Sequence, residues 1–420
     1  MVSEKQARRH WASGVAAWGA LILLESVCRG GAADWPQWRG PNRDGLSSET
    51  GLLKQWPEGG PKLLWTAKGI GTGFATVSVA DGLIYTAGNV GSDTLITAID
   101  LDGKTKWQAK NGKACAADSP GSRGTPTLND GKLYHENADG DVICLDAKSG
   151  EKVWALNVLK EFNGRNIQWA LAESLLIDGD NLIACPGGPE AAVVALDKKT
   201  GKTVWVCKGA RDDKPGYASP IVFEHKGLRQ IVTMTSLAAI GVNAKTGDLL
   251  WRHPHKTDYD ANIPTPILHE GCVFIDSGYG SGGALLKLNV EGEKCSVERV
   301  WSTKALDNHH GGVILVNGYL YGSNHGGKWV CLDFKTGEQK YAAGGVGKGS
   351  LTYADGMLYT YSEGGTAGLV KATPEGHEVI SKFNVPKGGK GPHWPHPVVC
   401  GGRLYLRHAD ALHAYDVKAQ

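Results

Sequence analysis

Two pairs of glycines follow histidines in a way that could bring imidazoles together around a ligand. His309 and His310 precede Gly311 and Gly312, and His325 precedes a second Gly-Gly pair. Imidazole titrates near neutral pH and binds ions such as Zn²⁺ or Mn²⁺, so histidines that converge could hold a metal or act as general bases. We expect His309, His310 and His325 to bind a divalent ion. Alternatively, they line a wet channel and bond to backbone carbonyls.

The elements that would position these histidines come from an internal repeat. The phrase Leu-Asp-x-x-Thr-Gly followed by Trp recurs, most clearly at residues 196–205, and variants occur at 145–154 and 242–251. Each copy is an apolar strand, a tight turn and a second strand that ends in an aromatic. Asp or Asn bonds to the backbone that follows it, and Gly adopts the positive φ that other residues avoid.

The spacing of the repeat predicts the fold. Successive equivalent aromatics are separated by 40 to 51 residues, which suits a four-stranded propeller blade. We take the equivalent positions to be Trp65, Trp107, Trp154, Trp205, Trp251, Trp301, Tyr341 and Phe383. The sequence therefore predicts an all-β protein: a single eight-bladed β-propeller of four-stranded antiparallel blades with almost no helix. We expect the repeated aromatics to be structural and to fill the seams between blades.

The two ends of the chain predict how the ring closes. Residues 396–417 supply three strands and lack the strand that ends in an aromatic. Residues 62–65 near the N-terminus supply such a strand. We expect this N-terminal strand to complete the C-terminal blade, which would leave no exposed sheet edge.

Residues 1–33 resemble a signal peptide. A basic stretch containing Arg8 and Arg9 precedes an apolar run from Val15 to Leu24, and small residues lead up to Asp34. The apolar run is too short to span a bilayer. We expect cleavage after Ala33, an exported periplasmic or extracellular product that is not transmembrane after cleavage, and a propeller that spans residues 34–420.

Charge and cysteine spacing exclude other classes of protein. A net charge of +2 gives no basic field for a phosphate backbone, so we expect no nucleic-acid partner. No CxxC or CxxCH motif occurs, which excludes a zinc ribbon and a c-type haem. We expect most cysteines to be buried thiols rather than disulfides.

In a propeller, the start of the first strand and the end of the second strand of each blade reach the same face. Polar and aromatic side chains at these two places should surround the channel mouth. Besides the three histidines above, this set contains Arg123, Trp169, Glu173, Tyr217, Asp260, Asn262, Asn324, Glu363, His393, Trp394, His396, Arg407 and His408.

The repeat phrase at residues 195–205 resembles the docking motif of pyrroloquinoline-quinone (PQQ) type propellers, which include quinoprotein alcohol dehydrogenases and BamB. The segment DWPQWRGP at residues 34–41, with 308–312 and 394–397, more narrowly resembles bacterial exported propellers labelled polyvinyl-alcohol-dehydrogenase-like. The resemblance covers residues 34–417. It implies the fold, and the same fold serves both dehydrogenases and scaffolds.

The resemblance also implies a cofactor, PQQ with Ca²⁺. A quinone would need a cation for its carboxylates, an aromatic face, and oxygens that hold Ca²⁺. The residue types that fit these needs are those of Arg123, Trp169, Glu173, Asp260 and Asn262. The vicinal cysteine pair and haem motif of many quinoproteins are missing from the sequence.

Two functions remain open at this point. The channel mouth could bind a small-molecule or carbohydrate ligand, as in a quinoprotein-like alcohol or sugar oxidoreductase or a metal-assisted enzyme that acts on carbohydrate. The alternative is a non-enzymatic scaffold, like BamB, that binds a protein partner in the cell envelope. An enzyme should show a deep pocket with convergent His, Glu and Arg side chains, and a scaffold should show a patch on loops outside the channel.

Overall fold

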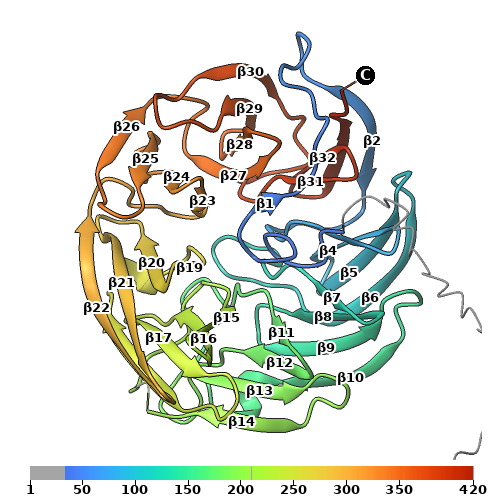
Figure 1. Cartoon of the computed structure of the whole chain (residues 1–420). Helices are drawn as coiled ribbons and strands as arrows, with labels where there is room; N and C mark the ends of the chain where they lie inside the picture. The colour runs from blue at the N-terminus through green and yellow to red at the C-terminus, as the bar shows by residue number, and fades with distance from the viewer. Residues whose placement is uncertain (1–33, 210, 420) are drawn as a thin grey trace, which may run out of the picture. The chain divides into compact units, whose positions relative to one another are not determined.

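The computed structural model describes residues 34–209 and 211–419, which belong to one compact unit (Figure 1). The predicted signal peptide, residues 1–33, lies outside the described residues. Eight small sheets are arranged in a ring, which confirms the predicted eight-bladed propeller. The helical elements among the described residues are α1 (Val158–Glu161) and the short 3-10 helix η1 (Asp258–Asp260).

The first four blades follow one another along the chain, and each runs from its innermost to its outermost strand. They are β3 (Ser78–Ala80), β4 (Leu83–Val90), β5 (Asp93–Asp100) and β6 (Thr105–Lys113); β7 (Thr127–Asn129), β8 (Lys132–Glu136), β9 (Asp141–Asp146) and β10 (Lys152–Asn157); β11 (Leu176–Asp178), β12 (Asn181–Ala184), β13 (Val193–Asp197) and β14 (Thr203–Cys207); and β15 (Ile221–His225), β16 (Leu228–Met234), β17 (Ala238–Asn243) and β18 (Leu249–Pro254).

The last four blades repeat the pattern, except that the eighth takes its outermost strand from the N-terminal part of the chain. They are β19 (Ile267–His269), β20 (Cys272–Ser277), β21 (Gly282–Glu291) and β22 (Lys294–Thr303); β23 (Ile314–Val316), β24 (Tyr319–Ser323), β25 (Trp329–Asp333) and β26 (Gln339–Ala343); β27 (Gly349–Ala354), β28 (Met357–Ser362), β29 (Thr366–Lys371) and β30 (Val379–Asn384); and β31 (Val398–Cys400), β32 (Arg403–His408), β33 (Ala411–Asp416) and β2 (Lys62–Lys68).

Ring closure follows the prediction from the sequence. β2 pairs antiparallel with β33, and Lys62 lies opposite Asp416. The N-terminal strand therefore supplies the strand that residues 396–417 lack. Closure in one blade protects the edge of β33 from pairing with another molecule.

The repeated aromatics lie at the seams between blades, as predicted. The indole of Trp107 packs over Gly150 of the next blade, where a Cβ would lie 2.7 Å from the ring, and its Nε1 donates to the carbonyl of Ala147. Trp251 is an exception because its Nε1 donates to Gln230 of its own blade. In the next blade, the turn between β21 and β22 contains Gly292, and a Cβ at this glycine would meet nothing within 4 Å, so no ring covers this turn.

An N-terminal segment, which we call the crossing segment (residues 35–47), contacts the inner strands of several blades. Trp35 exchanges two backbone hydrogen bonds with Val79 of the first blade, and Ser47 Oγ donates to Val399 O of the eighth. β1 (Leu46–Ser47) pairs in parallel with β27, so the seventh blade has five strands rather than the predicted four. β1 therefore covers the inner edge of β27, for which the repeat pattern predicts no neighbouring strand.

Most cysteines are buried thiols, in agreement with the expectation. Seven of the eight cysteines among the described residues are buried: Cys115, Cys144, Cys185, Cys207, Cys295, Cys331 and Cys400. Several belong to the apolar clusters between blades, where a thiol acts as a small apolar side chain. Among the described residues, no helix is long and apolar enough to cross a bilayer.

Candidate functional site

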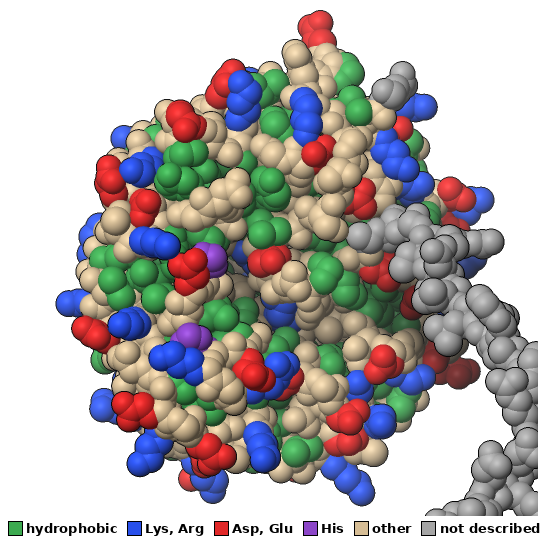
Figure 2. Space-filling model, in the orientation of Figure 1, with side chains coloured by type: hydrophobic (Ala, Val, Ile, Leu, Met, Phe, Trp, Pro, Cys, Tyr) green, Lys and Arg blue, Asp and Glu red, His purple; other side chains and the backbone are tan. Residues whose placement is uncertain are grey.

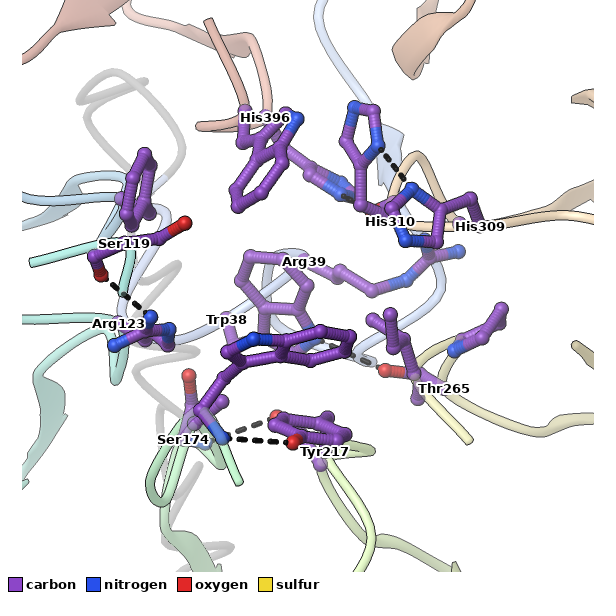
Figure 3. A pocket seen from close by; sticks show the side chains of 18 of the residues that line it. Trp38, Arg39, Ser119, Arg123, Ser174, Tyr217, Thr265, His309, His310 and His396 are labelled. Atoms are coloured by element: carbon purple, nitrogen blue, oxygen red, sulfur yellow. Dashed lines mark hydrogen bonds between the residues drawn. The ribbon is translucent and has the colours of Figure 1, made fainter. Parts of the chain in front are cut away.

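A cavity of about 290 Å³ opens at the channel mouth. The space-filling view shows the surface hollowed near the middle of the ring (Figure 2). The cavity walls combine aromatic rings, hydroxyls, histidines and two arginines (Figure 3), namely Trp38, Arg39, Phe74, Ser119, Arg123, Trp169, Ser174, Tyr217, Ser219, Thr265, Tyr279, His309, His310, Trp394 and His396, with Ala172, Ile263, Pro264 and Gly312 between them.

Most of these side chains come from the segments that lead into the innermost strand of a blade. Arg123 precedes β7, Trp169 precedes β11 and Tyr217 precedes β15. Tyr279 comes instead from the connection between β20 and β21. Both kinds of segment lie at the same face of the ring, which confirms the expectation from alternating strand direction. The repeat architecture therefore gathers side chains that are far apart in the sequence.

The three histidines predicted as metal ligands lie next to one another. The ring of His309 is 5.0 Å from that of His325 and 5.3 Å from that of His310, measured between centroids. Nδ1 of His310 is 3.3 Å from Nδ1 of His309, and Nε2 of His309 is 3.1 Å from the hydroxyl of Tyr279. Both ring nitrogens of His309 thus have protein partners.

Their arrangement differs from a metal site. No group of three or more His, Cys, Asp or Glu side chains with metal-binding geometry occurs among the described residues. Burial lowers the pKa of His309 to about 3 and that of His310 well below its usual value, because a charged imidazole would lose its hydration. Both rings are therefore neutral at pH 7. The metal-binding role of His309, His310 and His325 stays a prediction.

A second group of histidines lies near the C-terminal blade. His396 lines the cavity, where its ring is 4.5 Å from that of Trp38 and its Nε2 is 3.0 Å from the carbonyl of His310. His393 and His408 stack on each other at 3.6 Å, and His393 also bonds to the hydroxyl of Tyr361. Only His396 of these three lines the cavity.

Two of the five residues predicted to hold the cofactor line the cavity. Arg123 donates to the carbonyl of Ser119 at 2.6 Å, and its guanidinium carbon is 5.5 Å from the ring centre of Phe74. The ring of Trp169 lies 6.0 Å from that of Tyr217. These residues provide a cation and an aromatic face at the cavity wall.

The other three were expected at the channel mouth, and the structure places them elsewhere. Asn262 is buried, and its Oδ1 accepts hydrogen bonds from Thr257 and Ser277. Asp260 lies on η1 and faces Lys214 at 3.4 Å. Neither side chain lines the cavity.

Glu173 is also turned away from the cavity and is buried beside Glu136. Its Oε1 accepts from the backbone N–H of Cys185 at 2.6 Å. Burial raises the pKa of both carboxyl groups, most strongly that of Glu136, because a second carboxylate lies next to it. A proton held between the two is the arrangement that avoids two buried like charges.

The donor set of the cavity does not fit PQQ held by Ca²⁺. Ca²⁺ requires six to eight oxygen ligands, and these normally include carboxylates. The side chains that line the cavity include no Asp or Glu. The oxygens of Asn262 and Glu173 are directed into the protein instead, so the predicted calcium ligands are not available at this site.

The sequence alone did not identify several of the residues that line the cavity. Trp38 and Arg39 belong to the crossing segment and lie before the first repeat, so no repeat position pointed to them. Nε1 of Trp38 donates to Thr265 Oγ1 at 3.0 Å, which fixes the indole at the cavity. Phe74 and Tyr279 were also not predicted, although Phe74 precedes the first strand of its blade and Tyr279 follows the second strand of its own. The motif DWPQWRGP was the available signal, since it combines two Trp and an Arg in eight residues.

A family model described as outer membrane protein assembly factor BamB matches residues 47–188 and 92–343. The chain belongs to this family of PQQ-like propellers. The match covers more than half of the sequence and confirms the resemblance carried by the repeat phrase.

Individual relatives come from both branches of the family. Quinoprotein alcohol dehydrogenase PedH of Pseudomonas putida is 31% identical over 144 residues, which is 32% of this chain and 23% of that protein. BamB of Shewanella oneidensis is 24% identical over 242 residues, which is 51% of this chain and 55% of that protein. The chain thus spans only part of the relatives that it matches.

Solved structures support the fold. Quinohemoprotein alcohol dehydrogenase of Comamonas testosteroni superposes with a TM-score of 0.66 at 14% identity, over 92% of this chain and 81% of that one. BamB of Moraxella catarrhalis gives a TM-score of 0.62 at 17% identity, over 85% of this chain and 98% of that one. At these identities the likeness concerns the fold alone, and it extends equally to a dehydrogenase and to an assembly factor.

Proposed function

We propose that this protein is an exported propeller that binds a small ring-shaped molecule at its channel mouth. The observation that carries the proposal is the cavity itself, whose aromatic side chains come from several blades and from the crossing segment. Trp38, Trp169 and Trp394 offer ring faces to a flat ligand, and Arg123 supplies a cation at the wall. Aromatic faces with a few polar groups are typical of small-molecule sites.

Binding is better supported than catalysis. Histidines are the available bases in the cavity, and a base is effective when its pKa lies near the working pH. Burial lowers the pKa of His309 and of His396 to about 3, so both are weak bases. An alcohol or sugar oxidoreductase would also need a cofactor, and the cavity lacks the oxygens that would hold Ca²⁺ against a quinone.

A scaffold role is the second candidate, and the family match is the observation that favours it. Relatives named as BamB are assembly factors, which suggests a protein partner in the envelope for this chain as well. Some large exposed apolar side chains lie on the outermost strands of different blades, as with Val153 of β10, Val204 of β14 and Val300 of β22. Leu63 and Leu64 are instead neighbours on β2, at the blade that closes the ring.

Export is part of the proposal because residues 1–33 have the layout of a signal peptide. The mature chain would begin at Asp34, next to the crossing segment. Mass spectrometry of the protein recovered from an envelope fraction tests this directly, since an unprocessed N-terminus would contradict it.

The test of ligand binding starts with protein purified from its native compartment. Native mass spectrometry, an absorbance spectrum and elemental analysis would reveal a bound organic molecule, quinone or metal. Titration with a panel of sugars and aromatic acids, followed by calorimetry, then measures affinity. Trp169→Ala should weaken binding at least tenfold, and Trp154→Phe, on the outer rim, should leave it unchanged. Equal affinity in all three proteins would reject the cavity as the site.

A further inference from the structure

Tyr259 is an exposed residue that contacts two aromatic residues of the cavity wall. Its ring centre lies 5.6 Å from that of Trp169 and 5.4 Å from that of Tyr279. Trp169 and Tyr279 line the cavity and are half-buried, whereas Tyr259 is 55% exposed. Because Tyr259 touches the wall and is open to solvent, it lies at the rim of the cavity.

These three residues belong to a longer series of rings, which we call the aromatic row: Tyr217, Trp169, Tyr259, Tyr279 and His309. Neighbouring ring centres in the row are 5.2 to 6.0 Å apart. Each residue comes from a different connection between strands. Four of the five line the cavity, and Tyr259 is the member outside its wall. Figure 3 shows the two ends of the row, Tyr217 and His309, at the cavity. The row therefore continues the wall of the cavity to the surface.

The loop that carries Tyr259 is strained and firmly held. Tyr259 and Asp260 have φ angles of 61° and 58°, in the left-handed region that bulky residues rarely adopt. Asn262 anchors the loop, because its buried Nδ2 donates to the carbonyls of Thr235 at 2.8 Å and His255 at 2.9 Å. Strained backbone of this kind persists where the surroundings fix it, and it is concentrated at binding sites. The loop thus holds an exposed ring in a fixed position at the rim.

The cavity is small enough that a ligand of several linked rings would extend beyond it. Its volume of about 290 Å³ lies at the lower end of the roughly 300–1,000 Å³ that small-molecule sites span. The aromatic row leads from the cavity wall to Tyr259. A second ring that leaves the cavity along this row would therefore lie against Tyr259.

The cavity wall combines ring faces with hydroxyl groups. Ser119 and Thr265 both line the cavity. The hydroxyl of Ser119 makes no hydrogen bond to a described residue, and Thr265 Oγ1 accepts from Trp38 and keeps its proton for another acceptor. A sugar ring matches such a wall, because its C–H faces pack on aromatic rings and its oxygens accept hydrogen bonds. A wholly apolar ring would leave these hydroxyl protons without an acceptor.

We infer that Tyr259 forms a second subsite at the rim and that the ligand is a chain of two or more linked sugar rings. The inference rests on the proposed function, because the first ring of the chain occupies the cavity. The second ring stacks on Tyr259 and adds affinity without entering the cavity. Tyr259 therefore selects ligands by their length.

The experiment measures how affinity depends on the length of the sugar, using the full chain. Calorimetry compares glucose with cellobiose and cellotriose, which have β linkages, and with maltose and maltotriose, which have α linkages. In at least one series the parent should bind a longer sugar about five- to tenfold more tightly than glucose, as one additional ring contact predicts. Tyr259→Ala should remove this gain and should have a smaller effect on glucose.

Two further variants control for the loss of an exposed side chain. Tyr259→Phe keeps the ring and the backbone strain, and it should keep the gain because the Tyr259 hydroxyl makes no hydrogen bond to a described residue. Val204→Ala, at a position on β14 that is 52% exposed and outside the cavity wall, should behave as the parent. A gain that survives in Tyr259→Ala, or that is lost equally in Tyr259→Phe, overturns the rim subsite.

Single rings separate failure of the rim subsite from failure of the ring-binding proposal. The panel of single sugars and aromatic acids is titrated into the parent and into Trp169→Ala. If a single ring binds through Trp169 but longer sugars bring no gain, the rim subsite is rejected and the proposed function stands. If neither single rings nor longer sugars bind to the parent, the proposed function fails and the rim subsite fails with it.

Discussion

The indole Nε1 of Trp154 donates to the backbone carbonyl of Lys198 in the next blade at 3.0 Å. The same ring covers Gly201, where a Cβ would lie 2.8 Å from it. One side chain at the end of a blade therefore fixes both the position and the turn conformation of the following blade. Repetition of this contact around the ring explains why an aromatic returns at the end of each blade.

Replacement of Trp154 or Trp205 by Ala should destabilise the protein by about 3–5 kcal/mol, because a large ring is lost from a blade seam and a cavity remains. Trp154→Phe should cost less, since it mainly removes the hydrogen bond to Lys198, which is worth about 1 kcal/mol. Urea unfolding followed by circular dichroism measures both. Variants that unfold at the same midpoint as the parent would show that these rings are not part of the packing.

Deletion of residues 34–68 should produce aggregation, since it removes β2 and leaves β33 as an exposed strand edge. Deletion of residues 34–47 is the matched control: it removes the crossing segment and retains β2. We expect the shorter deletion to remain monomeric, with a lower melting temperature. Light scattering after size-exclusion chromatography distinguishes the two. A monomeric product of the longer deletion with unchanged melting would contradict closure through β2.

His396→Gln should make the protein less sensitive to acid. Burial lowers the pKa of His396 from 6.5 to about 3, so between these values the unfolded chain binds a proton that the folded chain excludes. The stability that the neutral ring provides is complete above pH 6.5 and is lost as pH falls towards 3. From pH 6.5 to 5 the parent should lose about 1–2 kcal/mol more than the variant.

The measurement for His396 is the free energy of unfolding at several pH values in both proteins. Other groups act in the opposite direction, since burial raises the pKa of Asp276 well above its usual value. The difference between variant and parent cancels such contributions. Two parallel pH profiles would mean that His396 is as easily protonated in the folded protein as in the unfolded chain.

Glu136→Gln should stabilise the protein at pH 8. Burial and the adjacent Glu173 raise the pKa of Glu136 well above 4.5, so the folded chain keeps a proton that the unfolded chain releases. The free-energy cost of keeping this proton in the folded chain grows as pH rises above 4.5. Gln has the shape of the protonated Glu side chain and carries no such cost. We expect a gain of about 1–3 kcal/mol at pH 8 that shrinks towards pH 5. Glu190→Gln, at an exposed position, should change stability little at either pH.

The sequence by itself determined the architecture of this protein. The Asp-x-x-Thr-Gly turn and the aromatic after it depend on local backbone chemistry, so Asp197, Gly201 and Trp205 could be recognised without knowledge of the surroundings. Periodic spacing then gave eight blades. The incomplete last repeat gave the partner of β33, because a propeller stabilises its strands by leaving no edge unpaired.

Tertiary structure decided the composition of the site. Strand direction correctly placed Arg123, Trp169 and His310 at the channel mouth, but the direction of each side chain depends on loop conformation and on neighbouring blades. Glu173 turned towards the N–H of Cys185, and Asn262 towards Thr257 and Ser277. Arg39 reached the cavity through the crossing segment, which obeys no repeat. Its Nη2 donates to the carbonyl of Val313, 274 positions away, and no local pattern records such a contact.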